Sequence, residues 1–304
     1  MKRAPKWSLL VSLVPLLTLA VLILLVPNIL INRGLIYTTI YIYISIITFI
    51  FLLRSKDYVP LKSSRLFDKI VTLIIWIMSV PFIIIIGIIA FVVISIVNTT
   101  VFFISEVFAI MVIYLFCIRL KIYGERCSFQ HIAIVNHCST IDDLLSAIVM
   151  GIKKWKVVFS PEITRIPFVR YLLQYTGIPL SRTEMASRIT ALRKVKREID
   201  KGYNILIFPE GKRLRVEMKD ELLLPFEDDG AFALSKLSGV PIAPTVISWT
   251  FLFKPRSGQW WFSPRTIKIY FLPPMYINKD EEIHDFKERV RNAMLMKLKE
   301  SLNK

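Results

Sequence analysis

The sequence predicts a layered α/β domain that is preceded by an N-terminal bundle of about four transmembrane helices. Long apolar stretches crowd the first 122 residues, whereas short apolar runs alternate with polar helical stretches from residue 123 onward. The composition agrees, because 54% of the 304 residues are hydrophobic, and 40 Lys+Arg against 23 Asp+Glu give a net charge of +17. We therefore divide the chain into a membrane domain, 1–122, and a cytosol-facing α/β domain, 123–304.

The membrane prediction rests on the length of the apolar segments. The four segments are 8–31, 35–53, 70–97 and 101–118. A helix of about 20 residues crosses a hydrocarbon core of roughly 30 Å, and the first two segments fit that length. The third is longer, so we expect tilt or a kink at Pro81. The fourth is short and carries Glu106, so it either spans the bilayer or lies in the interface.

The distribution of basic residues predicts how these segments are oriented. The N-terminus holds three basic residues, the first loop one, the second loop five and the third loop none. By the positive-inside rule, this alternation predicts four crossings with both termini cytosolic. A cleaved signal peptide over residues 1–26 is the alternative, but the apolar core is longer than the usual roughly 7–15 residues and further segments follow it.

The remaining composition excludes several classes of protein. A disordered chain does not carry this much apolar residue. Three Cys exclude a disulfide framework, and three scattered His leave no metal-binding spacing, so we expect neither a metal nor a cofactor. The basic charge suits an anionic membrane surface. Nucleic acid is not expected as a partner, because no basic run is interleaved with aromatic residues.

The α/β prediction comes from short apolar runs that alternate with helical stretches. The predicted strands are 131–135, 156–159, 178–180, 203–208, 241–248 and 266–272. The predicted helices are 142–151, 167–175, 184–201, 230–237 and 279–302. Strands and helices that alternate in this way indicate a layered α/β fold with one core.

A polar segment, residues 136–143, connects the first predicted strand to the first predicted helix. In α/β folds such a turn lies at the edge of the sheet, where ligands usually bind. His137 precedes the helix and Asp142 lies in its first turn, so the carboxylate can reach one imidazole nitrogen. An Asp-oriented His is a general base that can take a proton from a hydroxyl.

Other interpretations of this segment stay open. His137 can be a turn residue with a backbone partner, and Asp142 an acid at a helix N-terminus. Cys138 or Ser139 can be the nucleophile of a covalent mechanism, and Ser139 also suits a helix cap. Spacing does not choose between Asp142 and Asp143 as the partner of the His.

Two more strand ends carry positive charge. Lys212 and Arg213 follow the strand 203–208, after a Pro-Glu-Gly turn, and Arg182 follows the strand 178–180. Arg suits the geometry of phosphate, so these ends predict an anion site. The alternative is a pair of surface turns with solvated charge. The apolar strand at 240–244 is bounded by prolines and is expected to form a wall of the site, with ordinary core as the alternative.

These segments together resemble the glycerolipid (lysophospholipid) acyltransferase superfamily. Its first block, NHxSxxD, fits residues 136–142, and its IPVDR-like block is similar to 178–182, with Ser181 in place of Asp. Its third block, FPEGTR, fits 208–213 apart from Lys212, and its fourth, VPIxP, fits 240–244. Four blocks in this order, within roughly half of the chain, are a specific signal.

The closest resemblance is to 1-acylglycerol-3-phosphate acyltransferases. In that family the His is the general base and the Asp is its partner, which implies these roles for His137 and Asp142. The resemblance implies acceptor binding by a further group of residues: Arg182, Glu210, Gly211, Lys212 and Arg213. Many members have a Lys where this chain has Ser160, so phosphate binding is expected to depend more on the three cations of that group.

The resemblance implies a membrane-bound O-acyltransferase of phospholipid biosynthesis. It moves a fatty acyl group from acyl-CoA, a co-substrate, to the free hydroxyl of lysophosphatidate and gives phosphatidate by direct attack. The expected partners are the lysophospholipid acceptor, acyl-CoA and the bilayer. The expected place is the endoplasmic reticulum membrane, with a bacterial inner membrane as the alternative. Lysophosphatidylinositol, lysocardiolipin or glycerol 3-phosphate are alternative acceptors, and a non-catalytic membrane binding protein is a further alternative.

Overall fold

The protein is described by a computed structural model. It describes residues 101–116, 118–139, 141–165, 167–181, 185–213, 222–248, 250 and 266–302, together with isolated positions between 70 and 92. The predicted membrane segments 8–31 and 35–53, and most of 70–97, lie outside these residues and stay predictions. Within the described part of the chain, no helix has both the length and the apolar character that a membrane crossing requires.

A mixed seven-stranded sheet forms the centre of the α/β domain, with the strand order β1-β7-β6-β2-β5-β3-β4. The strands are β1 (Arg119–Tyr123), β2 (Ile132–Val135), β3 (Trp155–Phe159), β4 (Gly177–Pro179), β5 (Asn204–Ile207), β6 (Ile242–Ser248) and β7 (Thr266–Phe271). Among the strands of the described residues, β6 and β7 form the one antiparallel pair. The predicted α/β class is confirmed, and six of the seven strands correspond to predicted runs.

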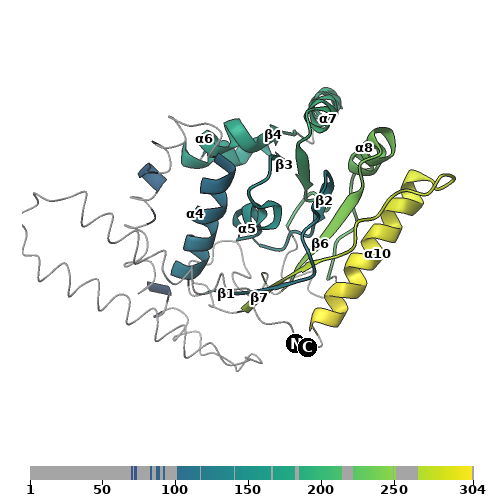
Figure 1. Ribbon diagram of the computed structural model, residues 1–304. Coiled ribbons are helices and arrows are strands. Elements are labelled where there is room, and N and C mark those ends of the chain that lie inside the picture. The colour runs from purple at the N-terminus through teal and green to yellow at the C-terminus, as the bar shows by residue number, and fades with distance from the viewer. Residues whose placement is uncertain are drawn as a thin grey trace, which may run out of the picture.

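Helices cover both faces of the sheet. They are α4 (Val101–Leu115), α5 (Ile141–Met150), α6 (Pro167–Thr176), α7 (Met185–Asp200), α8 (Gly230–Ser238) and α10 (Ile283–Leu302), with a short 3-10 helix, η2 (Pro161–Arg165). Figure 1 shows α4 and α5 on one side of the sheet and α7, α8 and α10 on the other. Strand β2 is buried on both faces, because successive side chains alternate between the two layers: Ile132 and Ile134 pack with α7, α8 and α10, and Ala133 and Val135 with α4 and α5.

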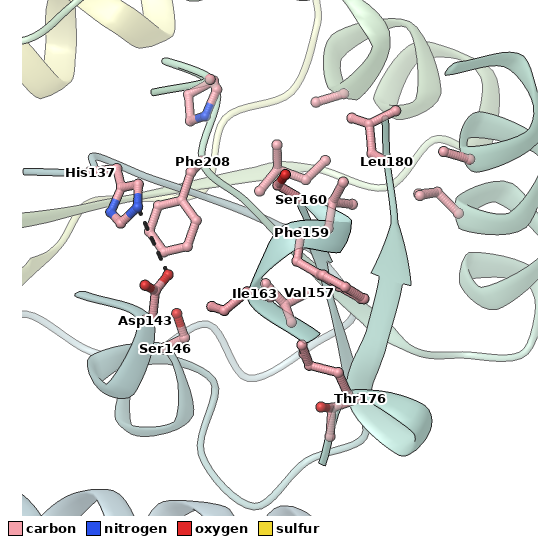
Figure 2. Close-up of a pocket in the computed structure, with 18 of the residues that line it drawn as sticks. His137, Asp143, Ser146, Val157, Phe159, Ser160, Ile163, Thr176, Leu180 and Phe208 are labelled. Atoms are coloured by element: carbon pink, nitrogen blue, oxygen red, sulfur yellow. Dashed lines mark ion pairs between the residues drawn. The ribbon is translucent and has the colours of Figure 1, made fainter. Parts of the chain in front are cut away.

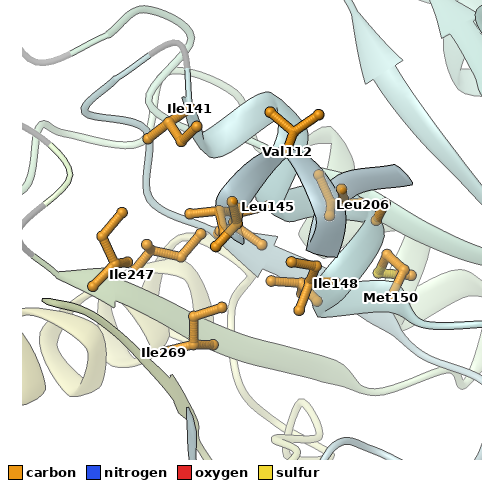
Figure 3. Packing of buried hydrophobic residues seen from close by; sticks show 14 of the residues in the cluster. Val112, Ile141, Leu145, Ile148, Met150, Leu206, Ile247 and Ile269 are labelled. Carbon is orange, nitrogen blue, oxygen red and sulfur yellow. The ribbon is translucent and has the colours of Figure 1, made fainter. Parts of the chain in front are cut away.

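Helix α4 is part of the core of this domain. Val112 of α4 packs with Leu145 and Ile148 of α5 (Figure 3), and Leu206 and Ile269 of the sheet complete the cluster. The segment predicted to span the membrane or lie in its interface, 101–118, therefore supplies a helix that packs on the sheet. Glu106, the residue expected to be costly in a bilayer, pairs with Arg126 at 3.3 Å.

Strand β1 was not predicted. Residues 119–123 pair in parallel with β7, from Arg119 opposite Thr266 to Tyr123 opposite Tyr270. The predicted boundary between residues 122 and 123 falls inside this strand, so the α/β domain begins earlier in the chain than expected. The basic residues Arg119 and Lys121 alternate with apolar residues along this edge strand.

Candidate active site

Two loops meet at one edge of the sheet and form the candidate active site. The loop with His137 follows β2, and the loop at 208–213 follows β5. These strands are parallel neighbours, with Ile132 opposite Ile205. The carboxyl ends of parallel strands meet at the same edge, which is where α/β folds usually bind ligands.

Asp142 contacts both the ring of His137 and the backbone of the loop that carries it. Asp142 Oδ2 lies 3.1 Å from His137 Nδ1 and accepts hydrogen bonds of 2.6 Å from the backbone N–H groups of Cys138 and Ser139. The residue is fully buried in the first turn of α5, where free N–H groups and the helix dipole favour a carboxylate. With Nδ1 donating to Asp142, Nε2 of His137 is the nitrogen left to accept a proton.

The His137 ring is packed as well as hydrogen-bonded. It stacks on Phe208, with ring centroids 4.4 Å apart and planes inclined by 27°. Phe208 was predicted as the end of a strand, without a role in the site. An aromatic ring at this distance restricts rotation of the imidazole, so the direction of Nε2 is set by the Asp142 hydrogen bond and by Phe208 together.

The pKa of His137 is raised above its ordinary value. Burial lowers this pKa, but the hydrogen bond to Asp142 and the charges of Asp142 and Asp143 outweigh burial because they favour the imidazolium. The charge of Arg213 acts in the opposite direction. The imidazole is therefore a stronger base than a free histidine, and it is neutral only at correspondingly higher pH.

Glu210 connects the two loops from inside the protein. Its Oε1 accepts a 2.7 Å hydrogen bond from the His137 N–H, and its Oε2 a 2.9 Å bond from the Leu224 N–H. The residue is 0% exposed, and burial raises the pKa of its carboxyl to about 7. Pro209 and Gly211 line the neighbouring cavity, whereas the buried Glu210 is not among its lining residues.

Three more of the predicted site residues lie in the loop after β5, at the same edge of the sheet as His137. Gly211 has φ 73°, a left-handed conformation that glycine adopts without strain, and Lys212 and Arg213 follow it at the cavity. Lys212 Nζ lies 3.5 Å from Glu227 Oε1. Arg182 lies outside the described residues, so its predicted role stays a prediction.

A cavity of about 1060 Å³ opens beside His137. Its wall is mainly apolar and comes from several helices and strands, with Phe108, Leu144, Val157, Leu172, Val195 and Ile207 among the lining residues. Figure 2 shows His137 and Asp143 at one end of the drawn lining and Thr176 at the other. Phe108 belongs to α4, so the predicted fourth membrane segment forms part of this wall.

The structure disfavours the covalent alternative. Cys138 and Ser139 are buried, and neither belongs to the residues that line the cavity. Burial raises the pKa of the Cys138 thiol well above its usual value, and the charges of Asp142 and Glu210 raise it further. The thiolate, which is the nucleophilic form of cysteine, is therefore suppressed at this position.

Comparisons with known proteins agree with this fold. The family model described as Acyltransferase matches residues 120–248. A chloroplastic 1-acyl-sn-glycerol-3-phosphate acyltransferase of Brassica napus, BAT2, is 27% identical over 169 residues, which are 55% of this chain and 45% of the relative. A chloroplastic enzyme of the same name from Arabidopsis thaliana, LPAT1, is 24% identical over 161 residues, 52% of this chain and 43% of the relative. The matched region thus spans less than half of the length of these relatives.

Among solved structures, the 1-acyl-sn-glycerophosphate acyltransferase PlsC of Thermotoga maritima shares the fold. It matches with a TM-score of 0.63 and 18% identity over 78% of this chain and 98% of that chain. Residues 120–248 thus match an Acyltransferase domain, on a fold that PlsC shares. The family match and the two plant relatives support the glycerolipid acyltransferase superfamily, close to the 1-acylglycerol-3-phosphate acyltransferases.

Proposed function

We propose that the protein is a membrane-bound 1-acylglycerol-3-phosphate O-acyltransferase that moves a fatty acyl group from acyl-CoA to lysophosphatidate and forms phosphatidate in phospholipid biosynthesis. One observation carries the proposal. The imidazole of His137 lines an apolar cavity, while its Nδ1 lies 3.1 Å from the buried carboxylate of Asp142. This arrangement is suited to taking a proton from a lipid hydroxyl beside a bound acyl chain.

The proposed reaction is a direct transfer. His137 Nε2 takes the proton of the acceptor hydroxyl while the hydroxyl oxygen bonds to the thioester carbonyl carbon. The tetrahedral intermediate then breaks its C–S bond, and the sulfur of CoA leaves with the proton from Nε2. Asp142 stabilises the imidazolium that exists between these steps, and general-base action of this kind contributes about 10²–10⁴-fold to the rate.

The walls of the cavity support the choice of substrates. Its apolar lining suits a fatty acyl chain, which is favourable to remove from water. Lys212 and Arg213 belong to the same cavity, and cationic side chains there suit the phosphate of lysophosphatidate. Arg182 is proposed to act with them, from the position that the family resemblance implies.

The membrane is part of the proposal because both the acceptor and the product are lipids. The predicted segments 8–31, 35–53 and 70–97 would keep the α/β domain at the bilayer surface. We propose the endoplasmic reticulum membrane with both termini cytosolic, where acyl-CoA is available, and a bacterial inner membrane as the alternative. The chloroplastic location in the names of the two plant relatives is a property of those proteins.

An acyl-transfer assay tests the proposal. The purified full chain in lipid vesicles is expected to move a radiolabelled acyl group from acyl-CoA to lysophosphatidate. His137→Ala and Asp142→Asn should each abolish turnover, whereas His284→Ala, on an exposed position of α10, should not change it. A trapped acyl-enzyme, or an equal loss in Cys138→Ser, would overturn direct attack.

An acceptor panel tests the identity of the acceptor. Lysophosphatidate is expected to give a higher kcat/KM than lysophosphatidylinositol, lysocardiolipin or glycerol 3-phosphate with the same long-chain acyl-CoA. A preference for another acceptor would keep the acyltransferase and replace its substrate. Absence of turnover with every acceptor would favour the non-catalytic membrane binding protein.

A further inference from the structure

Asp143 lies on the opposite side of the His137 ring from Asp142. Its Oδ1 is 3.8 Å from His137 Nε2, the nitrogen that faces the cavity. The Asp143 side chain is 35% exposed and lines the cavity, and Figure 2 shows the contact as a dashed line. Asp142, by contrast, is fully buried beneath the turn.

Helix geometry explains how neighbouring residues reach opposite sides of one ring. Consecutive positions in an α-helix are about 100° apart around the axis, since a turn contains 3.6 residues. In the first turn of α5, Asp142 therefore points toward the backbone of the His137 loop, and Asp143 points toward the cavity. Of these two aspartates, the family resemblance implies a role for Asp142 and none for Asp143, which faces the cavity.

We propose that Asp143 is a second positioning carboxylate of the acyl transfer, which acts through His137 by stabilising the proton at Nε2. The inference rests on the proposed function and adds a residue to it. The acceptor hydroxyl binds at Nε2 and gives its proton to that nitrogen as the new C–O bond forms. The positive imidazolium then lies between two carboxylates, Asp142 at Nδ1 and Asp143 at Nε2. The proton leaves with the sulfur of CoA, and Asp143 neither gains nor loses a proton.

The charges around His137 come from two elements. The first turn of α5 supplies Asp142 and Asp143, and the loop after β5 supplies Glu210 and Arg213. The two Asp raise the pKa of His137 and Arg213 lowers it. Burial raises the pKa of Asp143, and the nearby imidazolium and Arg213 oppose that rise. Asp143 is the carboxylate of this group whose oxygen approaches Nε2.

Asp143→Asn tests this role, because the amide has the shape of the carboxylate without its charge. The pKa of His137 should fall, and the acid limb of the pH profile of kcat/KM should move to lower pH. We expect kcat to fall about tenfold at neutral pH with little change in KM for either substrate, as for an interaction made mainly in the transition state. Titration of ¹³C-labelled histidine by NMR measures the His137 pKa without any turnover, and His137→Ala assigns its signal.

Two controls accompany the variant. Asp280→Asn removes the same charge from an exposed turn before α10 and should change neither the titration nor kcat. Asp143→Glu restores the charge and should recover part of both. A lower kcat in Asp143→Asn with an unshifted His137 titration overturns the inference, because it indicates a purely structural role.

The two proposals fail in different ways. Suppose that the wild-type protein transfers acyl groups and that Asp143→Asn has the same His137 titration and the same pH profile. This result would refute the role of Asp143 and leave the proposed function intact. A wild-type protein without any transfer refutes the proposed function and, with it, the part that Asp143 takes in the reaction. In that case the NMR titration still decides whether Asp143 acts on the protonation of His137.

Discussion

The carboxylate of Glu210 accepts a hydrogen bond of 2.7 Å from the backbone N–H of His137, a residue 73 positions earlier in the chain. Its second oxygen accepts from the N–H of Leu224, at 2.9 Å. One buried side chain thus ties the His137 loop to the loop after β5 and to the segment at 222–224. The family resemblance implies acceptor binding for Glu210, whereas these contacts support a role in holding the shape of the site.

Glu210→Gln distinguishes the two roles. The glutamine amide group would face a backbone N–H, so one buried donor would lose its acceptor, at a cost of about 1–3 kcal/mol in the free energy of unfolding. We expect lower stability in urea and a lower kcat, with KM for lysophosphatidate little changed. Glu125→Gln, at an exposed position, is the matched control. Unchanged stability together with a raised KM would instead support acceptor binding.

The raised pKa of His137 predicts the direction of the pH dependence. Only the neutral imidazole accepts a proton, so kcat/KM should fall as pH decreases through the pKa of His137 in the free enzyme. Because that pKa is raised, the fall should begin above the ordinary value of 6.5. A pH profile at constant ionic strength measures it. An acid limb well below pH 6.5 would show that a different group controls the rate.

The cavity predicts which acyl chains are accepted. Val157 of β3 lies in the wall, so Val157→Trp should narrow the cavity and shift the preference from long to shorter acyl-CoAs in a competition assay. Overpacking of this kind typically costs about 1–3 kcal/mol of stability. Ile152→Trp adds the same ring at a surface position, 64% exposed, and should leave the preference unchanged. An unchanged chain preference in Val157→Trp would place the acyl chain elsewhere.

We expect Arg213, in the loop after β5, to bind the phosphate of the acceptor. Arg213→Ala should raise KM for lysophosphatidate roughly tenfold, since a charge-assisted hydrogen bond is typically worth about 1.5–3 kcal/mol before solvent screening. Turnover with monoacylglycerol, which lacks the phosphate, should change much less. Lys279→Ala, at an exposed turn, controls for loss of charge alone. An equal effect on both acceptors would argue against a phosphate contact.

Several features of the site could be predicted from local sequence. His137 and Asp142 are separated by a single turn at the start of a helix, so their contact depends on local geometry that the pattern already indicates. The strands and helices of the α/β domain follow from apolar runs whose period matches the buried faces. For this reason the predicted bounds differ from the observed bounds by only a few residues. The family blocks supplied the remaining candidate site residues, whose roles stay predictions.

Other features depend on contacts that local sequence does not contain. An apolar helix that packs on a sheet has the same composition as one that packs in lipid, so the sequence alone did not show that α4 belongs to the core and lines the cavity. Strand β1 was not predicted because its pairing with β7 joins residues that are far apart in the chain.

The division between the two kinds of information has a physical basis. Hydrophobic period, turn chemistry and short spacings are written along the chain, and they established the fold class and placed an aspartate of the first helical turn within reach of His137. The stacking of Phe208 on His137, the burial of Glu210 and the volume of the cavity depend on how β2, β5 and their helices pack in three dimensions. The structure also shows that Asp142, and not Asp143, is the Nδ1 partner of His137, a choice that spacing alone left open.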